Sequence, residues 1–173
     1  MSPRTLAGAA LAGLAAAAVA VPAAHAVPDR AATPKITADG VGKVKLGKRH
    51  SVLRAQGLVG PIGPGCELAE NTRSAKLKPP LKGQVNYTLS SPRKVTDITI
   101  TGGAKARGVG IGATIPQIKA KFPKAKVDHS TESVFGITLV RIPPDGGGRI
   151  KFAVDVNTHK TTIIGVPIIA FCE

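Results

Sequence analysis

The segment 128–133 holds the residue types of a hydrolase catalytic triad in one short run. It contains hydroxyl groups, an imidazole and carboxylates, in the order Asp128-His129-Ser130-Thr131-Glu132-Ser133. In known triads these groups converge in space from separate segments, so adjacency along the chain is no sign of catalysis. We interpret the run as a polar loop between a helix and a strand. A secreted hydrolase that uses Asp128 or His129 is the less favoured alternative.

The two cysteines, Cys66 and Cys172, predict a disulfide. A leader, described below, directs the chain to an oxidising compartment, where a single pair of cysteines is expected to be joined. The bond closes a loop of about 100 residues, which removes roughly 4–5 kcal/mol of conformational entropy from the unfolded chain. A catalytic Cys66 is disfavoured because no histidine lies in a recognisable nucleophile setting and Cys172 is then left without a role.

Metal, nucleotide and cofactor binding are not indicated. Beyond the leader the histidines are His50, His129 and His159, and none has the His-x-x-x-His spacing of a metal site. Residues 108–112 read G-V-G-I-G, which is not the G-x-G-x-x-G dinucleotide pattern, and we expect a turn before a helix. The chain has one tyrosine, four phenylalanines and no tryptophan. This is too few for a binder that stacks sugars or single-stranded nucleic acid, and specific nucleic-acid recognition is not expected.

Positive charge is the clearest chemical signal. The chain has 24 lysines and arginines against 10 acidic residues, a net charge of +14. The basic residues cluster near two predicted helices and form a candidate anion-binding patch: Lys43, Lys45, Lys48, Arg49, Arg54, Lys105, Arg107, Lys119, Lys121, Lys124 and Lys126. Such a patch attracts polyanions: cell-wall teichoic polymers, anionic lipid headgroups, nucleic acid or an acidic protein. The alternative is charge that only keeps an exported protein soluble.

Residues 1–26 have the pattern of a signal peptide. Arg4 supplies the positive region, Leu6–Val21 the apolar region, and Ala24-His25-Ala26 the small-x-small cleavage site. A retained membrane anchor requires about 20 apolar residues without the break at Pro22, and a lipoprotein requires a cysteine at the cleavage point. The sequence therefore predicts a secreted, extracellular or wall-associated protein with no transmembrane segment after cleavage.

The remaining chain repeats itself after a polar tail at 27–37. With Val44 placed over Val109, a constant offset of 65 residues pairs identical or similar residues, among them Gly47/Gly112, Leu53/Ile118, Ala55/Ala120, Tyr87/Phe152 and Leu89/Val154. We predict one repeat at 38–102 and another at 103–173, which together form one domain.

Each repeat is expected to contain a glycine-rich turn, a short helix and three strands. In the second, Thr114 is the expected N-cap with Gln117 at capping-box spacing, and Pro123 ends the helix. Alternating apolar residues predict hairpins of 85–89 with 95–101 and of 149–156 with 161–166, preceded by strands near 66–71 and at 134–142. The predicted fold class is α+β: two tandem helix-plus-three-strand repeats that form one antiparallel sheet with helices on one face.

The repeated G-x-x-L/I-G turn before a short helix resembles the β-lactamase-inhibitory-protein family and the related bacterial outer-membrane-assembly lipoproteins. The matching residues are Gly42–Gly47 with Val52, Leu53 and Ala55, and Gly110–Gly112 with Ile115, Ile118 and Ala120. The resemblance spans residues 38–170 and implies a secreted binding module without catalysis. It implies no particular target.

Two functions remain open. The first is a non-catalytic, inhibitor-like module that binds an unknown protein through the sheet face, with Tyr87 and Phe152 as the residues to test. The second is an electrostatic binder of anionic cell-envelope polymers that uses the basic face. Binding that collapses as ionic strength rises distinguishes the second function from the first.

Overall fold

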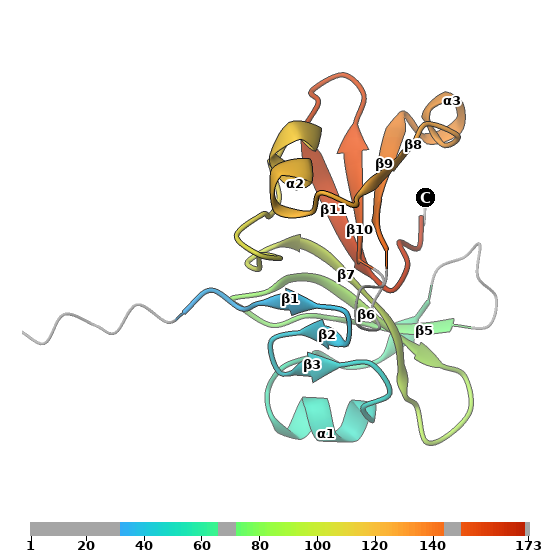
Figure 1. Cartoon of the computed structure of the whole chain (residues 1–173). Helices are drawn as coiled ribbons and strands as arrows, with labels where there is room; N and C mark the ends of the chain where they lie inside the picture. The colour runs from blue at the N-terminus through green and yellow to red at the C-terminus, as the bar shows by residue number, and fades with distance from the viewer. Residues whose placement is uncertain (1–31, 66–71, 144–149, 172–173) are drawn as a thin grey trace, which may run out of the picture. The chain divides into compact units, whose positions relative to one another are not determined.

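Strand is the main secondary structure of the part of the chain that the structure describes (Figure 1). The computed structural model describes residues 32–65, 72–143 and 150–171. Strands account for 44% of these residues and helices for 13%. The described residues lie in one unit, Ala32–Glu173.

The main feature is an eight-stranded sheet in which all neighbouring strands are antiparallel. Its order is β4 (Gly63–Pro64), β5 (Thr72–Lys76), β6 (Lys82–Thr88), β7 (Val95–Gly102), β11 (Thr161–Val166), β10 (Ile150–Asp155), β9 (Ile137–Ile142) and β8 (Lys126–Asp128). Strand β7 pairs with β6 on one side and with β11 on the other. The β7–β11 pairing therefore joins the strands of the first half of the chain to those of the second.

A smaller sheet consists of β1 (Ile36–Thr37), β2 (Gly40–Val41) and β3 (Val44–Lys45), drawn in blue in Figure 1. Glycine is required at position 40 because a Cβ there would lie 2.2 Å from the carbonyl oxygen of Val44. Strand β1 includes Ile36 and Thr37, the last two residues of the segment expected to be a polar tail.

The three helices are short: α1 (His50–Ala55), α2 (Ile115–Lys121) and α3 (Glu132–Phe135). Helix α2 begins and ends as predicted. Thr114 is its N-cap, the backbone N–H of Thr114 donates to Oε1 of Gln117 at 2.9 Å, and the helix stops before Pro123. Helix α1 has Arg49 at the cap position without a side-chain cap hydrogen bond.

The core lies between the sheet and the first two helices. Val85 and Tyr87 of β6 and Phe152 of β10 are fully buried, and Leu53 of α1 and Ile118 of α2 pack in the same cluster. Val85 and Tyr87 are two residues apart in β6, so their side chains point to the same side of the pleated sheet. This alternation is the pattern that the sequence displayed, and the predicted hairpins are confirmed as β6–β7 and β10–β11.

The predicted fold class is wrong. An α+β fold of two tandem helix-plus-three-strand repeats does not describe a chain that is mostly β, in which a three-stranded sheet precedes α1 and α3 interrupts the strands after α2. The strand expected at 134–142 begins later, at Ile137, because Val134 and Phe135 belong to helix α3. Strands of two or three residues, such as β4 and β8, are too short to show alternation, and only pairing with β5 and β9 defines them.

Several predictions fall outside the described residues. The signal peptide at 1–26, the strand near 66–71 and both cysteines, Cys66 and Cys172, lie there, so leader and disulfide stay predictions. Within 32–65, 72–143 and 150–171, no helix is long and apolar enough to cross a membrane.

Candidate functional site

The structure gathers only some of the predicted basic residues in one place. The residues of the predicted patch are exposed, except for the half-buried Lys45. Lys105, Arg107 and Lys124 line one groove, and Lys35 joins them. The other members do not line this groove: Lys43, Lys45, Lys48, Arg49, Arg54, Lys119, Lys121 and Lys126.

This hollow, called the basic groove below, has a volume of about 720 Å³. Its walls come from β1 and its flanks (33–38), the turn before α2 (105–108), the segment after α2 (122–125), the end of β9 (142–143) and Ile150 of β10. Among the described residues that line it there is no aspartate or glutamate. The described lining of the basic groove therefore carries positive charges and no negative charge.

Lys35 and Lys105 are partners in a parallel β-bridge. The backbone N–H of Ile36 donates to the carbonyl oxygen of Lys105 at 2.8 Å. The backbone N–H of Lys105 donates to the carbonyl oxygen of Pro34 at 3.1 Å. Like charges on directly paired strand positions repel each other. An anion bound between the two ammonium groups relieves this repulsion.

Arg107 occupies a turn position that favours other residues. Ala106 and Val109 exchange backbone hydrogen bonds of 2.7 and 2.9 Å, which close a two-residue turn. Arg107 has φ 47° and Gly108 has φ 86°, the pair of positive values that a type I′ turn requires and that asparagine and glycine adopt most readily. A non-glycine residue held there stores about 1–3 kcal/mol of strain, and such strain concentrates at ligand sites.

The strained turn holds the Arg107 guanidinium over an aromatic ring. Its Cζ lies 5.2 Å from the centroid of the Phe122 ring, within cation–π range. Phe122 is only 6% exposed, and its ring centroid lies 6.0 Å from that of Phe152 in the core. Arg107 therefore sits at the boundary between the charged rim of the groove and its apolar floor.

That floor is made of side chains that belong to the core. Ile36, Ala125 and Ile150 are buried, and Ile142 is partly buried against the same cluster. The groove therefore combines a cationic rim with an apolar floor, the composition of a small-ligand site in which a few polar groups fix orientation.

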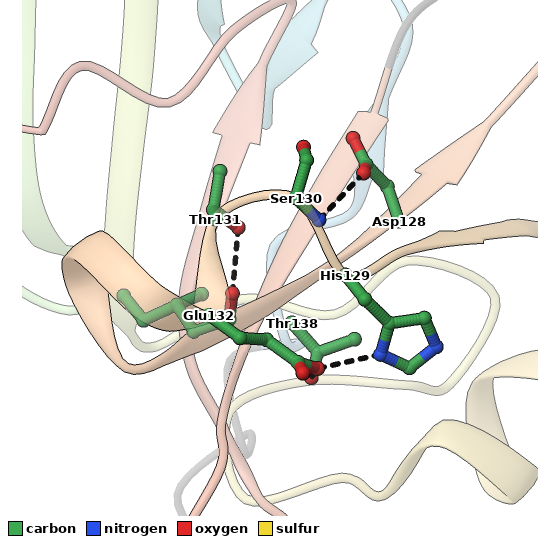
Figure 2. A network of polar contacts seen from close by, with 7 residues as sticks. Asp128, His129, Ser130, Thr131, Glu132 and Thr138 are labelled. Carbon is green, nitrogen blue, oxygen red and sulfur yellow. Dashed lines mark hydrogen bonds and ion pairs between the residues drawn. The ribbon is translucent and has the colours of Figure 1, made fainter.

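The run 128–133 forms a local polar network rather than a triad (Figure 2). His129 Nδ1 lies 2.6 Å from Oε1 of Glu132, which also accepts from the Thr138 hydroxyl. Asp128 pairs with Arg141 and accepts the backbone N–H of Ser130 at 3.0 Å. Among the described contacts Ser130 takes part through its backbone. The run is not the loop between a helix and a strand that the sequence predicted, because Asp128 ends strand β8 and Glu132 and Ser133 belong to helix α3.

Hydrogen bonds in this loop lower the pKa of Glu132. The Thr138 hydroxyl contributes most and His129 contributes next. Glu132 therefore stays ionised, which suits an ion pair at the start of α3 and does not suit a general acid.

The sheet residues expected to contact a protein partner are buried. Tyr87 and Phe152 are each 0% exposed because they point into the core. Apolar surface lies elsewhere: Phe135 and Phe171 stack with centroids 4.8 Å apart, and Val134 is 71% exposed. Phe135 and Phe171 help to line a hollow of about 670 Å³, called the apolar hollow below.

No three His, Cys, Asp or Glu side chains group into a metal site within the part of the chain that the structure describes. The three histidines beyond the leader have separate neighbours. His50 Nε2 lies 3.1 Å from the carbonyl oxygen of Gly60, and its ring meets that of Tyr87 edge-on at 5.3 Å. His129 pairs with Glu132, and His159 lies in the β10–β11 turn.

Comparison of the chain with protein-family models, curated proteins and solved structures finds no match. The geometry of the groove therefore carries the functional argument. Sequence reasoning missed Lys35 because a single lysine before a two-residue strand shows no periodicity. It also missed the Arg107 turn, since Arg-Gly lacks the Asn-Gly signature of a two-residue hairpin.

Proposed function

We propose that the chain is a secreted, non-catalytic binding module that holds an anionic partner at the basic groove. The observation that carries this proposal is the convergence of Lys35, Lys105 and Arg107 on one groove whose described lining has no acidic residue. The candidate partners are anionic polymers of the cell envelope, whose repeated charges match the positive field of the chain. From the family resemblance we retain only a binding role without catalysis.

Salt dependence tests this function. Binding of a poly(glycerol phosphate) teichoic polymer to the full chain is measured as ionic strength rises through a few hundred millimolar. Charge-based binding falls steeply because the Debye length shrinks from about 10 Å at 0.1 M to about 3 Å at 1 M. Binding that does not change over this range contradicts the proposal.

A matched pair of variants locates the binding. The groove variant combines Lys35→Gln, Lys105→Gln and Arg107→Gly, and the control variant combines Lys78→Gln, Lys94→Gln and Lys160→Gln, three exposed residues that do not line the groove. Both variants lose the same charge. The groove variant is expected to lose most of the affinity and the control variant little. Equal losses mean that binding is diffuse and that the groove has no special role.

A second function is favoured by the exposed apolar surface near the apolar hollow. Val134 is 71% exposed and its neighbour Phe135 is 38% exposed, so apolar surface is contiguous there, and contiguous apolar surface is typical of contact sites. We propose as the alternative a protein partner that docks over Val134 and Phe135. A partner captured from the culture at high ionic strength, and lost with Val134→Asp, supports this function, whereas capture that persists in the variant contradicts it.

A further inference from the structure

We infer that the basic groove binds an anionic amphiphile: an unbranched apolar chain that ends in one carboxylate. This inference rests on the proposed function in one respect, that the basic groove holds an anion, and it adds an occupant that differs from the envelope polymer.

The apolar floor is the first reason. A polymer of sugars and phosphates would pair with the rim of Lys35, Lys105 and Arg107 but would leave the apolar lining without a complementary surface. Phe122 is only 6% exposed, so the apolar surface that a chain can cover belongs to Pro123, Ile142 and Pro143. Covering this surface is favourable in proportion to its area. The floor therefore favours a ligand with an apolar part.

The position of Arg107 is the second reason. Because its guanidinium Cζ lies 5.2 Å from the centroid of the Phe122 ring, a carboxylate held by Arg107 starts its attached chain beside that ring. The guanidinium presents a planar set of donors that fits a carboxylate with two parallel hydrogen bonds. Lys35 and Lys105, side by side across their bridge, add positive charge at the same rim.

The size of the groove is the third reason. Its volume of about 720 Å³ falls within the range of about 300–1,000 Å³ typical of small-ligand sites. This volume holds one apolar ligand chain of medium length. Such a ligand binds as a single molecule and does not have to be part of a membrane.

Decanoate is the probe that tests the inference, titrated into the ¹⁵N-labelled full chain at low ionic strength. Hexanoate and octanoate measure the effect of chain length, acetate presents the head group alone, and decyl maltoside presents the chain without charge. Affinity is expected to rise about fourfold per added methylene, the fold-change that corresponds to about 0.8 kcal/mol for each buried methylene. Amide shifts are expected at 105–108, at Phe122, Lys124 and Ala125, and at Ile142.

Two variants separate loss of the site from loss of the fold. Arg107→Gly removes the guanidinium while glycine adopts φ 47° without strain, and it is expected to weaken decanoate binding at least tenfold. Lys105→Gln provides a second test without a backbone change, with an expected loss of severalfold. Lys78→Gln, away from the groove, is the control that should bind as the wild type does.

The outcomes distinguish the inference from the function on which it rests. Decanoate binding that grows with chain length and falls in both groove variants supports it. Equal binding of acetate and decanoate, or shifts that map to Phe135 and Phe171, overturn the inference and leave polymer binding standing. Binding of decyl maltoside as tight as that of decanoate overturns it as well. Failure of both decanoate and the teichoic polymer overturns both proposals.

Discussion

Lys35 and Lys105 lie side by side as partners of a parallel β-bridge, although they are far apart in the sequence. The bridge is secured by two backbone hydrogen bonds, so the two ammonium groups share one edge of the basic groove. Like charges on paired strand positions are unfavourable, so we expect this pair to lower the stability of the unliganded chain and a bound anion to offset that loss.

Reversing one charge of this pair separates its effect on stability from its effect on binding. Lys35→Glu places opposite charges across the bridge and is expected to raise the free energy of unfolding by about 0.2–1 kcal/mol. The same change weakens anion binding. Urea unfolding measures the first effect and titration with decanoate the second. Lys78→Glu, with the same change of net charge, controls for general electrostatics, and an equal gain there shows that the bridge is not the cause.

The turn at Arg107 predicts an order among substitutions. Asparagine adopts positive φ at this type I′ position, whereas a β-branched residue does not. Arg107→Val is therefore expected to be less stable than Arg107→Asn by about 1–3 kcal/mol. Thermal and urea unfolding of the two variants measure this difference, and both variants lose the cation–π contact with Phe122. Equal stabilities would show that the turn relaxes without cost.

The buried hydroxyl of Tyr87 predicts a stabilising substitution. No described residue forms a hydrogen bond with this hydroxyl, and burial raises the pKa of Tyr87 to about 12. Tyr87→Phe removes the unpaired group and keeps the ring, so the free energy of unfolding is expected to rise by about 1 kcal/mol. Tyr87→Leu, which loses the edge contact with His50, is expected to be less stable than the wild type. A loss of stability in Tyr87→Phe contradicts this account.

Asp155 predicts an acid-dependent contribution to stability. Its Oδ1 accepts the backbone N–H and the hydroxyl of Thr158 at 2.7 and 2.9 Å, and the backbone N–H of Asn157 at 3.1 Å. The Thr158 bonds are the main cause that holds the pKa of Asp155 below its ordinary value of 3.8. A lowered folded-state pKa gives stability that is present above pH 3.8 and is lost as the pH falls through the folded-state pKa.

The test compares Asp155→Ala with the wild type in urea unfolding from neutral pH to pH 3. The variant is expected to be less stable at neutral pH, and the difference should shrink as the pH falls. A difference that stays constant with pH would falsify the assignment and would indicate that the turn, rather than the charge of Asp155, carries the stability.

Sequence patterns were reliable where one element contains its own signal. The alternation of Val85 and Tyr87 marked β6, and Thr114 with Gln117 marked the start of α2. They failed for the class of the fold, because β4, β8 and the small N-terminal sheet are too short to carry a periodicity. They left open whether Tyr87 and Phe152 are exposed, because alternation shows that a residue lies on one face and does not show which face is covered; the structure buries both.

The sequence by itself determined the strong positive charge, the two confirmed hairpins and the capped helix α2, since each depends on residue types or on neighbours within a few positions. Only the tertiary structure decided which charges act together. Pairing of β7 with β11 and the bridge between Lys35 and Lys105 join segments that are distant in the chain. These contacts are made by backbone hydrogen bonds. Every residue type except proline has the same backbone donor and acceptor, so a pattern of side chains cannot predict which segments pair. The bridge between Lys35 and Lys105 brings two walls of the basic groove together.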